Sequence, residues 1–152
     1  MADLKALCEA AGFHGVRTYI ASGNVVFESK LSEREVKREI EKGLSAYAGK
    51  SIPVMVRTAA EMAAATRENP FVGAPGNRTV AIFLDDAPSS DALEGMSGRV
   101  NEEVALGRRE IYVRYGDDMG HSKLKIPAAK NGTARNMNTV AKLAVMARAA
   151  EP

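Results

Sequence analysis

The segment 133–139 carries side chains that can hold an anion, at a position where a helix is expected to begin. A guanidinium, two amides and a hydroxyl come together there, from Arg135, Asn136, Asn138 and Thr139. The first N–H groups of a helix have no partner within it, and they attract phosphate or carboxylate. An anion site is one interpretation of this segment. In the other, Asn136 or Asn138 caps the helix and Arg135 pairs with a carboxylate.

A second polar group surrounds an expected tight turn. Ser22, Gly23 and Asn24 are small residues that can bring backbone N–H groups close to a ligand. A turn needs the same residue types for its own geometry. Arg17 and Tyr19 share one face of the preceding strand, because side chains alternate along a strand. This face is either open to a ligand or a solvated edge.

The remaining reactive residue types predict neither a metal nor a cofactor. His14 and His121 are the only histidines, and neither has a second ligand at metal-binding spacing. The lone Cys8 lies on the apolar stripe of the first expected helix, which favours a small core residue over a reactive thiol. The sequence has no nucleophile–base pair, phosphate-binding glycine loop or zinc signature.

The composition of the chain further limits which classes of protein it can belong to. The chain has 152 residues, 45% hydrophobic and 26% charged, which suits one globular domain or two small halves that share a core. No apolar run approaches the roughly 18–20 residues that cross a bilayer, so no membrane contact is expected. A single cysteine favours a reducing compartment and hence a cytoplasmic protein. Residues 98–152 carry 10 Lys and Arg against 6 Asp and Glu, and this basic excess makes nucleic acid a candidate partner.

The hydrophobic pattern of the first half predicts three strands and three helices. The strands cover 16–20, 24–28 and 53–58. The helices cover 3–12, 32–49 and 58–69, and the second and third open with capping boxes formed by Ser32 with Glu35 and Thr58 with Glu61.

The second half repeats the order of elements after a linker at 72–78. We expect a strand at 79–84, a helix at 90–96, a hairpin at 103–115, a helix at 122–130, a short strand at 133–135 and a closing helix from about Asn138. This is the βαββαβ order of a ferredoxin-like fold. The predicted class is therefore α+β, with two ferredoxin-like halves in tandem, 1–77 and 78–152, best treated as one compact unit. The first half lacks its opening strand, and a C-terminal helix closes the second.

Two motifs in combination resemble domain-of-unknown-function family 1697. They are the run 16–27, from Val16 to Phe27, and the run 133–139, from Thr133 to Thr139. The resemblance implies two ferredoxin-like halves packed together and no particular activity. Family members usually begin with an apolar strand that would precede Met1, which leaves the natural start open, and carry Trp where Met137 stands. An unbranched thioether fills apolar gaps, so we expect Met137 to be buried.

The missing opening strand has an expected consequence. In a ferredoxin-like half that strand lies between the third and fourth strands, so 24–28 and 53–58 would each have an open edge. They would pair with each other, or a strand from the second half or from another chain would fill the gap. Exposed sheet edges of this kind make a homo-oligomer a candidate assembly.

Three classes of function follow. The favoured prediction is a non-catalytic module that binds an anionic small molecule or nucleic acid near Arg135. One alternative is an enzyme with a polar site between the two halves, drawing on residues such as Ser22 and Asn24. The other is an assembly or interaction domain. The residues alone do not decide whether the protein is an enzyme.

Overall fold

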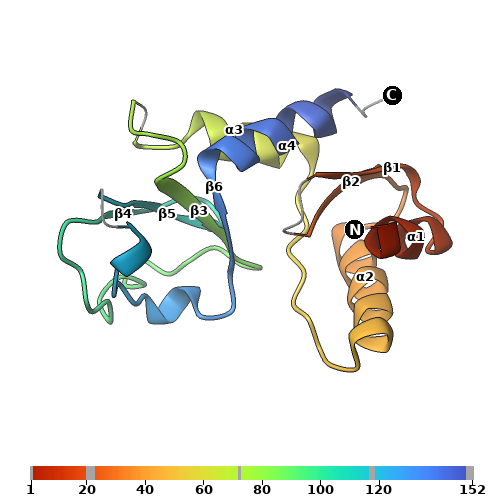
Figure 1. Ribbon diagram of the computed structural model, residues 1–152, viewed down its shortest axis with the longest axis horizontal. Helices are drawn as coiled ribbons and strands as arrows, with labels where there is room; N and C mark the ends of the chain where they lie inside the picture. The colour runs from red at the N-terminus through yellow and green to blue at the C-terminus, as the bar shows by residue number, and fades with distance from the viewer. Residues whose placement is uncertain (1, 20–22, 72, 117–118, 150–152) are drawn as a thin grey trace. The chain divides into compact units, whose positions relative to one another are not determined.

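The computed structural model describes residues 2–19, 23–71, 73–116 and 119–149 (Figure 1). Within these residues the fold is α+β, as the sequence predicts, and it consists of two small antiparallel sheets and four α-helices. The chain forms two compact units: unit 1 is Met1–Met62 with Lys142–Pro152, and unit 2 is Ala63–Ala141. No described helix is long and apolar enough to span a membrane.

Unit 1 holds a helical pair and a β-hairpin. Its elements are α1 (Ala2–Ala10), β1 (His14–Tyr19), β2 (Asn24–Glu28) and α2 (Glu33–Ala48), followed by the first residues of α3 (Ala59–Arg67). β1 and β2 pair antiparallel, with Tyr19 opposite Asn24 and an irregularity before Arg17. Gly23 has φ of +83°, which a residue with a side chain rarely adopts, so glycine is required in the turn.

The core of unit 1 is small and depends on aromatic packing. The buried members are Cys8, Phe13, Val16, Val36 and Ile40. The rings of Phe13 and Phe27 stack with centroids 4.3 Å apart. Burial raises the pKa of the Cys8 thiol to about 11, with a smaller contribution from Glu9, so the thiol is protonated at neutral pH. The prediction that Cys8 is a core residue is confirmed.

Capping fixes both ends of α2. The Ser32 hydroxyl accepts the Glu35 N–H at 3.2 Å, and the Glu35 carboxylate accepts the Ser32 N–H at 3.3 Å. Hydrogen bonds from Ser32 hold the pKa of Glu35 below its ordinary value. Gly49 ends the helix in the left-handed conformation, and its N–H donates to the Ser45 carbonyl. The predicted capping box and glycine stop are both present.

Unit 2 is built on a four-stranded antiparallel sheet in the order β4-β5-β3-β6. The strands are β3 (Thr79–Phe83), β4 (Glu103–Leu106), β5 (Glu110–Arg114) and β6 (Thr133–Asn136). Two short 3-10 helices, η1 (Met119–His121) and η2 (Pro127–Ala129), lie between β5 and β6. α4 (Met137–Ala149) follows β6 directly.

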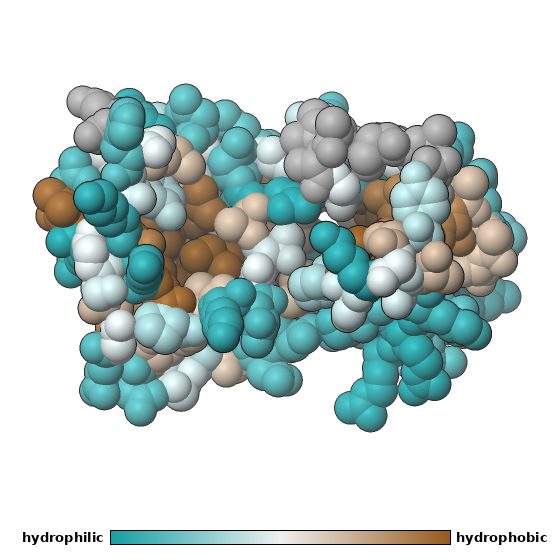
Figure 2. Space-filling view, turned by 60° about the horizontal axis from the view of Figure 1, so that its bottom comes forward, coloured by the Kyte–Doolittle hydropathy of each residue, from teal (hydrophilic) through white to brown (hydrophobic). Residues whose placement is uncertain are grey.

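The two faces of this sheet differ in character. One face carries Ile82, Ile111 and Val113, which pack against apolar residues of the loops. Burying a side chain such as Ile111 completely contributes about 1.5–3 kcal/mol. Figure 2 shows apolar side chains at the surface of unit 2, in a hollowed region bordered by hydrophilic residues. The opposite face carries Tyr112, whose hydroxyl donates to the Ala65 carbonyl of α3 at 2.7 Å.

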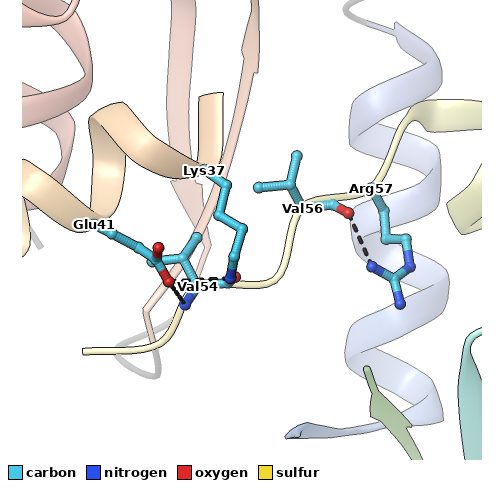
Figure 3. Close-up of polar contacts among 5 residues, drawn as sticks. All are labelled: Lys37, Glu41, Val54, Val56 and Arg57. Atoms are coloured by element: carbon cyan, nitrogen blue, oxygen red, sulfur yellow. Dashed lines mark hydrogen bonds and ion pairs between the residues drawn. The ribbon is translucent and has the colours of Figure 1, made fainter. Parts of the chain in front are cut away.

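The strand predicted at 53–58 is not formed, because side chains of α2 occupy the backbone that would pair (Figure 3). Lys37 Nζ donates to the Val54 carbonyl at 2.5 Å and to Glu41 at 3.0 Å. The same Glu41 oxygen accepts the Val54 N–H at 3.1 Å. Among the described residues β2 pairs with β1 alone, so the pairing of 24–28 with 53–58, which was one of the expected alternatives, is absent.

Two predicted helices of unit 2 are wrong as well. Residues 90–96 form successive turns in which N–H groups bond three residues back, as from Ala92 to Ser89. Of the helix expected at 122–130 only the short η2 is formed, and η1 precedes this range. Between these two 3-10 helices the chain is held by a backbone bridge between Ser97 and Lys125, so a contact distant in sequence prevents a continuous helix.

Candidate functional site

The described residues of unit 2 form a hollow of about 450 Å³ at one end of the sheet. Its lining residues come from the loop after α3 and from the end of β5: Pro70, Phe71, Gly73, Ala74, Pro75 and Arg114. The hollow is open to solvent, so it is a shallow depression of the surface and not an enclosed cavity. The lining combines one cation with rings, small side chains and exposed backbone.

The loop that forms most of the hollow is held by its own hydrogen bonds. The Asn69 side chain accepts the Phe71 N–H at 3.0 Å, and the Phe71 carbonyl accepts the Ala74 N–H at 3.0 Å. The Pro75 carbonyl accepts the Thr79 hydroxyl at 3.1 Å, which ties the loop to β3. These bonds and two prolines restrict the backbone of the described loop residues.

Arg114 supplies the positive charge of the hollow. It lies on β5 opposite Glu103 of β4, and its Nη1 is 3.2 Å from a Glu103 carboxylate oxygen. Its side chain is 36% exposed, so solvent and solutes reach it. Its other guanidinium N–H groups have no partner among the described residues. A guanidinium with an unpaired edge can take a carboxylate or phosphate through two parallel hydrogen bonds.

Two of the first N–H groups of α4 find acceptors within unit 2. The Asn136 side chain accepts the Thr139 N–H at 2.9 Å, and the Gly76 carbonyl accepts the Met137 N–H at 3.1 Å. Asn136 therefore caps the helix, which is the alternative interpretation of the segment 133–139. A Cβ on Gly76 would lie 2.2 Å from the Asn138 Oδ1, so the loop after α3 also contacts the exposed Asn138.

Arg135 lies on the same face of the sheet as Tyr112, because both residues are opposite Ala81. One of its guanidinium nitrogens donates to the Ala134 carbonyl at 2.8 Å. Burial lowers the pKa of Arg135 below its ordinary value. Met137 is 6% exposed, which confirms the prediction that it is a packing residue.

The candidate residues of unit 1 make bonds within the fold. The Arg17 guanidinium donates to the Met146 carbonyl at 2.8 Å, near the end of α4 where a cation is favoured. The buried Asn24 amide donates to the Tyr19 carbonyl at 3.2 Å across the hairpin. Ser22 lies outside the described residues. Among the residues that are described, no group of histidine, cysteine and acidic side chains could hold a metal ion.

The sequence interpretation placed an anion site at 135–139 and missed the hollow beside Arg114. The composition of 70–75, with two prolines and a glycine, indicated a turn and no more. The pairing of β5 with β3, in which Arg114 is opposite Thr79, brings Arg114 to this loop. The two paired residues are 35 positions apart in the sequence, so no local pattern could reveal the contact.

Comparison with known proteins adds the family. The model of the family described as protein of unknown function (DUF1697) matches residues 1–112. The chain belongs to this family. A conserved bacterial protein from Streptococcus pneumoniae has a similar solved structure, with a TM-score of 0.77 and 21% identity, covering 97% of this chain and 88% of that chain. At this identity the likeness shows the fold alone. No curated protein matches the chain.

Proposed function

We propose that this DUF1697 protein is a non-catalytic module that binds a small anionic ligand in the hollow beside Arg114. The observation that carries the proposal is the partly exposed guanidinium beside the hollow, with one nitrogen paired to Glu103. A guanidinium gives an anion both charge and direction.

The test is a titration with inorganic phosphate, followed through the backbone amide signals of Gly73 and Ala74. We expect saturable shifts in the wild-type protein and affinity at least about tenfold weaker in Arg114→Gln, because a charge-assisted bond contributes about 1.5–3 kcal/mol. Lys130→Gln removes the same charge from an exposed residue of unit 2 and should bind like wild type. Equal affinities of Arg114→Gln and Lys130→Gln would rule out the hollow as the site.

The same titration examines the segment first considered from the sequence. Arg135, Asn136, Asn138 and Thr139 remain a second proposed location for the anion, supported by the guanidinium of Arg135 and the exposed amide of Asn138. Since Met137 and Thr139 already donate their N–H groups within the fold, fewer donors remain there. Shifts confined to residues 136–140 would move the proposal from the hollow to this helix end.

Nucleic acid is the second candidate partner, favoured by the basic excess of residues 98–152. A protein that neutralises several phosphates loses affinity steeply as salt rises. Binding of a mixed-sequence oligonucleotide that weakens by a thousandfold between low and physiological salt would support it. The enzyme alternative, and a homo-oligomer through the sheet edges of unit 1, remain predictions without a specific observation in their favour.

We also propose that both halves follow the ferredoxin-like plan. In unit 2 the opening strand β3 lies between β5 and β6, the third and fourth strands of that half, and this order supports the proposal. In unit 1 the hairpin and α2 keep the same sequence order. The cytoplasm is the proposed location, on the evidence of one buried, unpaired cysteine.

A further inference from the structure

The outer strand of the unit 2 sheet leaves part of its backbone without a partner. β4 stands at the end of the strand order, and its neighbour among the described residues is β5 (Figure 1). The Gly107 N–H donates to the Glu110 carbonyl across the hairpin at 2.7 Å, so Gly107 faces β5. Because the bonding direction alternates along a strand, Ala105 also faces β5, whereas Val104 and Leu106 point their N–H and C=O groups outward. Neither of these two residues has another backbone partner in the part of the chain that the structure describes.

The side chains beside these open backbone groups are apolar. Val104 and Leu106 lie opposite buried residues of β5, so they extend the apolar face of the sheet to its edge. Leu106 is 36% exposed, and Val100, just before the strand, is 89% exposed. Edge strands that stay single usually carry lysine, proline or a bulge. β4 has none of these, and its one charged residue, Glu103, is paired with Arg114 of the same sheet.

Antiparallel pairing of this edge with itself brings apolar side chains together. A two-fold axis at Ala105 places Val104 of one copy opposite Leu106 of the other, and such a pair exchanges both backbone hydrogen bonds. The groups used are the N–H and C=O groups that β4 leaves open. The same axis sets the exposed Arg108 opposite Glu102 of the second copy, so the flanking charges have opposite signs. The edge is therefore complementary to a second copy of itself in hydrogen bonds, apolar contact and charge.

We propose that β4 is the interface of a weak homodimer, in which two copies pair antiparallel along this edge around Ala105. The two four-stranded sheets join into one, with the apolar faces of both copies on the same side. The exposed Val100 lies beside the hairpin turn of the second copy and is shielded from water there. Because β4 is only 4 residues long, the interface is small and the dimer dissociates on dilution.

Sedimentation equilibrium from about 5 µM to about 500 µM tests the association, because this range covers weak interfaces. We expect the mean mass to rise with concentration from that of one chain toward that of two. Leu106→Lys puts a cation at the edge in both copies and should weaken association at least about tenfold. Leu31→Lys is the matched control, because Leu31 is 40% exposed and lies in unit 1, and it should associate like wild type. A wild-type chain that stays monomeric throughout, or a Leu106→Lys variant that dimerises as tightly as Leu31→Lys, would overturn the proposal.

A cysteine at position 105 tests the register directly. On the two-fold axis the two copies of residue 105 form a non-hydrogen-bonded pair, with Cα atoms ~4.5 Å apart, a separation that a disulfide spans. Ala105→Cys should therefore form an intermolecular disulfide under mild oxidation, while the native Cys8 is buried. In Glu103→Cys the two cysteines would be more than ~10 Å apart along the paired strands, so the disulfide should not form. Equal yields of cross-linked dimer from the two variants would overturn the pairing. Should Ala105→Cys fail to fold, the sedimentation experiment still decides, because it does not use this variant.

Discussion

Gly98→Ala is expected to lower the free energy of unfolding by about 2–4 kcal/mol, combining overpacking with backbone strain. Gly98 has φ of +72°, where a Cβ is disfavoured. A Cβ at this position would lie 2.1 Å from the Lys123 carbonyl oxygen, and backbone cannot rotate away as a flexible side chain can. The substitution should therefore separate two loops that are distant in sequence.

Gly98→Ala is also expected to disturb the hydrogen bonds of a buried carboxylate, that of Glu102. Glu102 accepts the Val100 N–H at 2.7 Å and the Ser122 hydroxyl, and these bonds, led by that of Ser122, hold its pKa below the ordinary value. A lowered pKa means that the group stabilises the fold above its ordinary pKa and that this contribution is lost as pH falls. Gly98→Ala should weaken this acid sensitivity along with the loop contact.

Gly120→Ala is the matched control, measured with Gly98→Ala by urea unfolding at neutral pH. Gly120 lies in η1, and a Cβ there would meet nothing within 4 Å. Gly120→Ala should change the free energy of unfolding by no more than about 0.5 kcal/mol, which is the usual range for surface substitutions. Similar losses in both variants would contradict the contact between Gly98 and Lys123.

Tyr112→Ala is expected to lower the free energy of unfolding by about 3–5 kcal/mol, because removing a buried aromatic ring leaves a cavity. Tyr112 is 1% exposed at the centre of β5, and its hydroxyl donates to the Ala65 carbonyl. Tyr112→Phe keeps the ring and should lose about 1–2 kcal/mol from the unpaired carbonyl. Tyr47→Phe, at a side chain that is 69% exposed, should change little.

The raised pKa of Tyr112 also predicts how the free energy of unfolding changes at high pH. Burial, with smaller contributions from Glu110 and Glu68, raises the pKa of Tyr112 to about 12. Between the ordinary pKa near 10 and this value, the unfolded chain releases a proton that the folded chain retains, so stability falls as pH rises. The slope of stability against pH over that interval should be shallower in Tyr112→Phe. An unchanged slope would show that the Tyr112 hydroxyl is not protected in solution.

The sequence predicted the local structure correctly wherever that structure depends on residues close together in the chain. The capping boxes at Ser32 and Thr58 were predicted, and both are formed. Gly12 ends α1 with φ of +91°, as a glycine stop should. The strands of both hairpins were placed within two residues, because period-two alternation and a short turn are properties of the segment itself.

Prediction failed where distant contacts decide the conformation. Residues 53–58 have strand composition, yet Lys37 and Glu41 bind the backbone of Val54. The bridge between Ser97 and Lys125 similarly overrides the helical pattern at 122–130. The hollow beside Arg114 belongs to this class, since two segments about forty residues apart form it. The start of the last helix was predicted within one residue, because a helix start is a local feature.

The most direct test of anion binding at Arg114 is a double-mutant cycle with Glu103, measured as the dissociation constant of inorganic phosphate. Glu103→Gln removes the carboxylate that occupies Nη1 and should tighten phosphate binding several-fold. Arg114→Gln should abolish the saturable shifts of Gly73 and Ala74, and the double variant should behave like Arg114→Gln alone. Phosphate binding that is unchanged by Glu103→Gln and that persists in the double variant would contradict the account.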